Sequence, residues 1–308
     1  MALARLTDPF GPKAARPLES EAQALARVLP RLALEARQVS AQVALGIHGR
    51  RRAGPGETFW QFRNFTSGEP ADRIDWRRSA RDDRLYVRER EWETASTYWL
   101  WIDLSASMGY QSSLAKASKR DRALVLGLAM ADLLVRGGER VGLLGLTAPI
   151  VSRTIIGRFC EALVRSTTAL DAAMPPGPAP GPRDRLLLIG DFIQPQDDFT
   201  KALNALSSRG ALGAAVQVRD PAEHLFPFSG ETEFVGPEDG SRWVVGDAQG
   251  MGEAYRQRLA GHEADLRAAC LRRGWTFHTH GTGQTATEGL LGLAMLLQQG
   301  ASAALKGA

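Results

Sequence analysis

The sequence predicts an α/β fold built on a mainly parallel, doubly wound sheet, with a smaller helix-plus-β segment ahead of it. Its 308 residues exceed the roughly 250 at which single cores usually stop growing, so two domains are expected. An apolar run at 98–104 is typical of a strand buried on both faces. From there strand-like and helix-like segments alternate to the C-terminus, as they do in parallel sheets covered by helices.

Residues 1–95 form the first predicted domain, the smaller segment. From Glu19 to Val39, apolar residues recur at helical spacing, so one helix is expected, kinked or divided at Pro30. The remaining elements are loops and short strands at 46–68, a turn or short helix at 71–80 and a half-exposed strand at 84–93.

Residues 96–308 form the second predicted domain, which contains the sheet. Its strands are expected at 98–104, 140–146, 150–154, 185–189, 214–218 and 275–279. Its helices are expected at 118–136, 156–173, 199–208, 252–273 and 285–299. Pro- and Gly-rich residues indicate a linker at 175–182, and aromatic and turn residues indicate a small β-excursion at 221–246.

The formal net charge of +4 is concentrated in one segment. Residues 48–90 contain eleven Arg against seven Asp or Glu, so the rest of the chain is balanced. Such a segment either forms a surface for nucleic acid or an acidic partner, or pairs with its own carboxylates. Within it, the mixture of Arg73, Asp75, Trp76 and Arg81 predicts a buried ion-pair network that joins the N-terminal segment to the sheet domain.

No feature of the sequence predicts a membrane span or export. The longest apolar candidate, 123–135, is interrupted by Asp132 and falls short of the roughly 18 residues that cross a bilayer. Asp8 and Pro9 stand where a signal peptide would be apolar. We therefore expect a cytoplasmic protein.

Oxygen-bearing side chains follow two predicted strands at the points where these strands end. Asp103, Ser105 and Ser107 come directly after the first apolar strand, and Asp191 follows the strand at 185–189. The carboxyl ends of parallel strands share one edge of a sheet, so these side chains are expected to approach one hard cation, Mg²⁺ or Mn²⁺. The alternative is that they only cap the turns that follow, as Asp and Ser often do.

The sequence offers little for catalysis. No G-x-S-x-G elbow surrounds Ser105, no phosphate-binding glycine loop occurs, and no general base is identifiable near Asp103. We therefore expect a binding module that is not an enzyme. Two alternatives stay open: a nucleic-acid-binding protein that uses the Arg-rich segment 50–90, and a Mg²⁺-dependent phosphohydrolase.

Seven motifs between Gly46 and Met108 resemble, in order, those of the bacterial family called domain of unknown function 58. They are Gly54–Phe59, Arg63–Phe65, Gly68–Trp76, Ser79–Arg81, Leu85–Glu89, Glu93 and Asp103–Met108. One difference is Phe192, where many related domains have Gly.

The resemblance implies a von Willebrand factor A-like domain with a metal-ion-dependent adhesion site. Asp103, Ser105 and Ser107 match its D-x-S-x-S element, Asp191 matches the aspartate after the fourth strand, and Thr167 or Thr168 is the candidate for its threonine. The resemblance also implies a partner, a MoxR-type AAA+ ATPase, with a role in the maturation of protein complexes. The bound metal would then accept a carboxylate from that partner.

Overall fold

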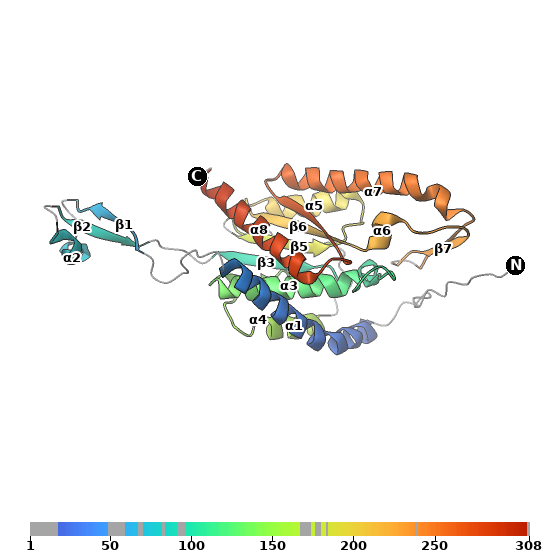
Figure 1. Ribbon diagram of the computed structural model, residues 1–308, viewed down its shortest axis with the longest axis horizontal. Coiled ribbons are helices and arrows are strands. Elements are labelled where there is room, and N and C mark those ends of the chain that lie inside the picture. Colours follow the sequence, from blue (N-terminus) through green and yellow to red (C-terminus); the bar gives the residue numbers. More distant parts are fainter. Residues whose placement is uncertain are drawn as a thin grey trace. The chain divides into compact units, whose positions relative to one another are not determined.

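The chain folds into two compact units in its computed structural model (Figure 1). We call residues His48–Ala95 the hairpin unit, and Met1–Ile47 together with Ser96–Ala308 the sheet unit. The structure describes residues 18–48, 59–66, 70–81, 84–90, 96–166, 174–175, 180–182, 184–237 and 240–306.

The sheet unit is built on five strands in the order β4-β3-β5-β6-β9. They are β3 (Thr97–Ile102), β4 (Arg140–Leu143), β5 (Arg185–Gly190), β6 (Leu212–Arg219) and β9 (Thr276–Gly281). Every neighbouring pair is parallel. The predicted fold class, an α/β protein with a central parallel sheet, is therefore confirmed.

Helices cover both faces of this sheet because successive strand side chains point to opposite faces. Leu187 and Ile189 of β5 join the core beneath one helical layer, whereas Leu186 and Leu188 join the core beneath the other. The first layer contains α1 (Leu18–His48), α3 (Lys119–Arg136), α4 (Ile155–Arg165) and α8 (Ala286–Lys306), and the second contains α5 (Gln196–Ser207) and α7 (Ala248–Leu271). In the part of the chain that the structure describes, no helix is both long and apolar enough to cross a membrane.

Helix α1 packs within the sheet unit, which corrects the predicted grouping of residues 1–95. Its buried residues recur every three or four positions and share a core with the sheet: Leu25, Leu29, Leu32, Ala36, Val39 and Val43. Polar contacts tie it to α3 through Arg31 and Asp121, 2.9 Å apart, and to α8 through Thr287 and Gln42, also 2.9 Å apart. Pro30 lies inside α1 without ending it.

Two predicted segments of the sheet unit differ from the observed elements. Residues 150–154 were expected as a strand, but only Ile150 pairs, in an isolated bridge with Val141. The β-excursion after β6 contains helix α6 (Pro221–Leu225) and a hairpin of β7 (Thr232–Val235) and β8 (Arg242–Val245). The rings of Phe226, Phe228, Phe234 and Tyr255 pack together at this excursion.

The hairpin unit consists of an antiparallel strand pair and short helical turns. Its elements are β1 (Phe59–Asn64), η1 (Ala71–Arg73), α2 (Trp76–Ser79) and β2 (Tyr86–Arg90). Ile74 bridges to Val87, and both are buried. The Tyr86 amide donates to the Ser79 hydroxyl over 2.9 Å, so this contact fixes α2 against β2.

The structure of the hairpin unit does not contain the predicted buried network of Arg73, Asp75, Trp76 and Arg81 among the residues that it describes. Trp76 is 61% exposed and Arg81 is also exposed. Asp75 is half-buried and acts as the N-cap of α2, where its Oδ1 accepts from the Arg78 amide over 2.9 Å. The backbone of Arg73 ends η1, and its side chain lies outside the described part. A local helix cap therefore accounts for Asp75.

Candidate metal centre

Asp103 lies at the carboxyl end of β3 and is held there by its own backbone. Its amide donates to the Ile189 carbonyl of β5 over 2.8 Å, which continues the sheet by one residue. Its Oδ1 accepts from the Ser105 amide over 2.9 Å, and its side chain is buried. The turn after β3 therefore fixes the carboxylate at the edge of the sheet.

Ser105 and Ser107 place two hydroxyls beside this carboxylate. Ser105 is the N-cap of the short helix η2 (Ala106–Gly109), and the two Oγ atoms lie 3.2 Å apart. Both serines are buried. The structure thus brings together the three residues that the D-x-S-x-S spacing predicted.

Gly190, the last residue of β5, allows Asp103 to approach this strand. A Cβ at position 190 would lie 2.9 Å from the Asp103 Cβ and 3.0 Å from its Oδ2. Any side chain there would displace the carboxylate. Asp191 follows directly, so the two predicted aspartates occupy neighbouring strand ends.

Asp191 is paired with a buried lysine that the sequence did not identify. Lys119, the first residue of α3, is only 1% exposed and donates to Asp191 Oδ2 over 2.8 Å and to Glu223 Oε1 over 2.6 Å. Burial alone would lower the pKa of its ammonium group, but the two carboxylates outweigh burial and raise this pKa above its ordinary value. Lys119 is therefore a fixed internal cation.

Glu223 and Asp220 form a capping box at the start of α6. The Asp220 side chain accepts from the Ala222 amide, and Glu223 Oε2 accepts from the Asp220 amide, each over 2.8 Å. Asp220 Oδ2 also accepts from the Ser112 amide over 2.8 Å, which ties the loop after η2 to the end of β6. The spacing of Asp220 and Glu223 in the sequence is a recognisable signal for a capping box. The sequence alone does not indicate that Glu223 also contacts Lys119.

Phe192 follows Asp191 with a left-handed backbone, at φ 52°. A residue with a Cβ pays roughly 1–2 kcal/mol for this conformation. The ring is fully buried and packs on Trp101 and Phe199, at centroid distances of 6.3 Å and 5.0 Å. The Phe192 carbonyl accepts from His262 Nε2 over 2.7 Å. These contacts hold the turn that carries Asp191.

The remaining predicted ligands, Thr167 and Thr168, lie outside the described residues. In the described ranges, no three His, Cys, Asp or Glu side chains are placed to share a metal ion. A metal here would therefore need the serine hydroxyls. Carboxylate and hydroxyl oxygens are the ligands that Mg²⁺ accepts, so Asp103, Ser105 and Ser107 fit such an ion.

Comparison with known proteins identifies relatives of unknown function. A family profile described as "Protein of unknown function DUF58" matches residues 61–267. Uncharacterized proteins of Mycobacterium tuberculosis and Mycobacterium bovis are each 27% identical in an alignment of 263 positions that covers 79% of this chain and 80% of theirs.

Two solved structures resemble the chain more loosely. One is an aerotolerance-related membrane protein from Bacteroides fragilis, 15% identical, with a TM-score of 0.39 over 67% of this chain and all of that one. The other is a conserved hypothetical protein, BatB, from Bacteroides thetaiotaomicron, 14% identical, with a TM-score of 0.39 over 68% of this chain and all of that one.

Proposed function

Because the chain belongs to the family described as protein of unknown function DUF58, we propose a function from the site itself. We propose that the sheet unit is a metal-dependent protein-binding module and not an enzyme, with Mg²⁺ or Mn²⁺ as its cation. In this proposal the metal-binding residues are Asp103, Ser105 and Ser107, with Asp191 beside them and Thr167 or Thr168 completing the set.

The observation that carries the proposal is the gathering of one carboxylate and two hydroxyls at the carboxyl edge of the sheet. Open α/β sheets bind their ligands at this edge. Lys119 pairs with both Asp191 and Glu223, so it offsets part of the charge of Asp191, and Asp103 would supply the larger share of the negative charge that a divalent ion receives. Such an ion stays electrophilic and accepts a carboxylate from outside. Metal-dependent recognition of an acidic side chain follows from this charge balance.

The finer identity of the domain and its partner are part of the same proposal. A parallel sheet with D-x-S-x-S after its first strand is similar to a von Willebrand factor A domain, and the family resemblance suggests a MoxR-type AAA+ ATPase as partner. The module would then work in the cytoplasm as an adaptor in the maturation of protein complexes.

Metal titration tests the site. Mg²⁺ or Mn²⁺ should raise the unfolding free energy of the wild type, by about 2.7 kcal/mol at a concentration 100 times Kd, through mass action. Asp103→Asn should abolish this response. The matched control is Asp198→Asn on α5, whose side chain is 52% exposed and which should respond like the wild type. Equal stabilisation of wild type and Asp103→Asn would refute the site.

Partner binding and turnover test the function. The purified chain should retain a MoxR-type ATPase in a pull-down, and EDTA or Asp103→Asn should weaken this retention at least tenfold. Phosphoesters, nucleotides and peptides should not turn over above the level of that variant. Metal-dependent turnover that the variant loses would favour a phosphohydrolase. Salt-sensitive binding to nucleic acid that ignores EDTA would favour the Arg-rich segment 50–90.

A further inference from the structure

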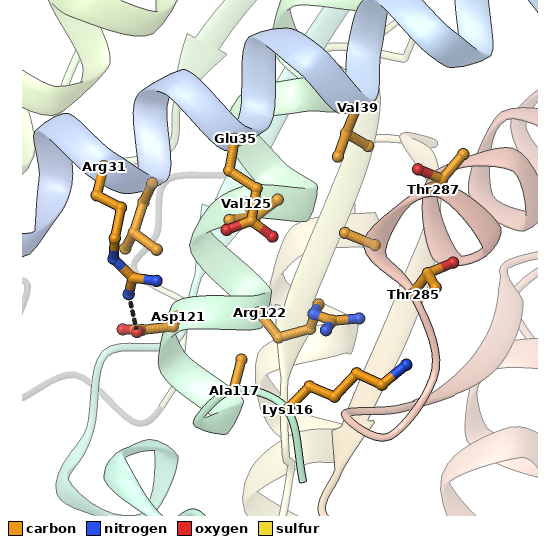
Figure 2. A pocket seen from close by; sticks show the side chains of 12 residues that line it. Arg31, Glu35, Val39, Lys116, Ala117, Asp121, Arg122, Val125, Thr285 and Thr287 are labelled. Atoms are coloured by element: carbon orange, nitrogen blue, oxygen red, sulfur yellow. Dashed lines mark hydrogen bonds and ion pairs between the residues drawn. The ribbon is translucent and has the colours of Figure 1, made fainter.

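A second polar site lies in the sheet unit, apart from the residues proposed to hold the metal. It is a cavity of about 290 Å³ between α1 and the first turns of α3 and α8 (Figure 2). Its charged lining residues are Arg31, Glu35, Lys116, Asp121 and Arg122, and two threonines of α8 line it as well. Helix α1 and the start of α3 with the loop before it therefore contribute charged groups to one partly open cavity, and α8 contributes hydroxyl groups.

Arg122 is a buried cation in the wall of this cavity, and only 4% of it is exposed. Its Nη1 donates to the Gln284 carbonyl over 2.5 Å and lies 3.2 Å from His280 Nε2. Its Nε has no acceptor among the described residues. The acceptors of this guanidinium are thus neutral. Burial lowers the pKa of Arg122 below its ordinary value, and the nearby carboxylates of Glu35 and Glu288 oppose this shift.

Two long helices begin at the same cavity. Lys116, Ala117 and the first turn of α3 line one side, and Thr285, Ala286 and Thr287 at the start of α8 line another. The first amides of a helix have no acceptor within it, and they carry the positive end of the helix dipole. In Figure 2 the side chains of Arg122 and Lys116 extend toward Thr285. The Thr285 amide and hydroxyl already donate to Glu288 Oε2, each over 2.9 Å, so this carboxylate offsets part of the positive charge at the start of α8. The amides of Ala286 and Thr287 are the donors that we assign to a ligand.

The opposite wall supplies one carboxylate that the cavity can use. Arg31 and Asp121 pair with each other over 2.9 Å, so their charges cancel. Glu35 projects from α1 over Val125 toward the side that holds Arg122 (Figure 2). The cavity therefore has groups of both charges. Arg122 and Lys116 are suited to bind an anionic group, and Glu35 is suited to accept from a hydrogen-bond donor or to pair with a cation.

We propose that this cavity binds a small metabolite that carries a phosphoryl or carboxylate group next to an ammonium or hydroxyl group. The oxyanion would lie between Arg122, Lys116 and the start of α8, and its neighbouring group would donate to Glu35. Because the ligand would contact α1, α3 and α8 together, its binding would fasten α1 to the sheet unit. The proposal is independent of the metal.

The binding test uses the whole chain in EDTA, at constant ionic strength set with chloride. The probes are inorganic phosphate, succinate and O-phosphoserine, and the readout is the ¹H–¹⁵N shifts of the Ala286 and Thr287 amides. O-Phosphoserine should bind at least tenfold more tightly than phosphate, because only it carries an ammonium group for Glu35. Succinate distinguishes a carboxylate-binding site from a phosphoryl-binding one, and binding by either oxyanion supports the site. Unchanged amide shifts with all three probes would overturn it.

Variants at side chains that are not buried keep the test independent of folding. Lys116 is on the surface, so Lys116→Ala should fold normally and weaken O-phosphoserine binding about tenfold. Glu35→Gln should remove the preference for O-phosphoserine over phosphate. The matched control is Lys201→Ala on α5, whose side chain is 75% exposed in the other helical layer. An equal loss in Lys201→Ala, or a preference that survives Glu35→Gln, would contradict the assigned contacts.

Discussion

The two units of the chain use charged residues in opposite ways. In the sheet unit, Lys119 and Asp191 are both nearly inaccessible to solvent and lie 2.8 Å apart. In the hairpin unit, Arg81 is exposed and Asp75 serves its own short helix by accepting from the Arg78 amide. The first arrangement joins residues 72 positions apart, and the second joins residues three positions apart.

This difference matters because burial sets the energetic consequence of losing a partner. A buried charge without its partner costs several kcal/mol, whereas an exposed pair contributes at most about 1 kcal/mol. The end of β5 therefore tolerates few changes, which is what a fixed binding site needs. Substitution of Arg81, which is exposed, should have a much smaller effect. A graded series of substitutions should separate the two units.

The largest effect is expected from Lys119→Met. The substitution leaves the buried Asp191 carboxylate without its cation, and it should lower the unfolding free energy by about 3–5 kcal/mol in urea denaturation. Glu223→Gln should cost less, because Glu223 is partly exposed and Lys119 keeps Asp191. The control, Lys201→Met, removes only an exposed pair and should stay within about 0.5 kcal/mol. If Lys119→Met unfolded at the same urea concentration as the wild type, the Lys119–Asp191 pair would have to be exposed to solvent.

The next effect concerns pH, through His280 at the end of β9. Burial, with help from Arg122 and His278, lowers the pKa of His280 from 6.5 to about 4, while Glu288 opposes this shift weakly. Below pH 6.5 the unfolded chain binds a proton that the folded chain refuses. This contribution to stability is therefore complete above pH 6.5 and is lost as pH falls toward 4, by up to about 3 kcal/mol. His280→Gln should flatten that part of the pH profile of unfolding; an identical profile would contradict it.

A smaller effect is expected from Gly190→Ala. The new Cβ would lie 2.9 Å from the Asp103 Cβ, so the two strand ends must separate, at a cost of about 1–3 kcal/mol. The same shift should abolish stabilisation by Mg²⁺. The matched control is Gly261→Ala in α7, where a Cβ meets nothing within 4 Å and the change should stabilise by about 0.5–1 kcal/mol. If Gly190→Ala kept the full stabilisation by Mg²⁺, metal binding would not depend on the close approach of Asp103 to Gly190.

The sequence predicts most of the fold because burial on two faces leaves a local signal. The predicted strand at 185–189 marks β5 to within one residue, and the strand at 214–218 lies wholly inside β6. The position of α1 was not predictable in the same way. Its apolar stripe shows that one face is buried, but the stripe does not say which surface covers that face.

The candidate site is predictable only where it is local. Asp103, Ser105 and Ser107 come together because one turn carries all three. Lys119 was missed because it begins a helix in the sequence like any exposed lysine, and only the tertiary structure brings it to Asp191. The dense charges of the hairpin unit suggested a buried network for the same reason: composition reports charge but not depth.

The smallest effect in the series is expected from Asp75→Ala in the hairpin unit. A buried ion-pair network would lose about 3–5 kcal/mol, but a helix cap should lose only about 1 kcal/mol. The change is best followed at the Arg78 amide, which donates to Asp75 and should exchange its hydrogen about fivefold faster in the variant. Asp75→Asn keeps a capping oxygen without the charge, so it should restore slow exchange. If Asp75→Asn were as damaging as Asp75→Ala, the negative charge itself would matter, and the hairpin unit would resemble the sheet unit in how it uses its carboxylates.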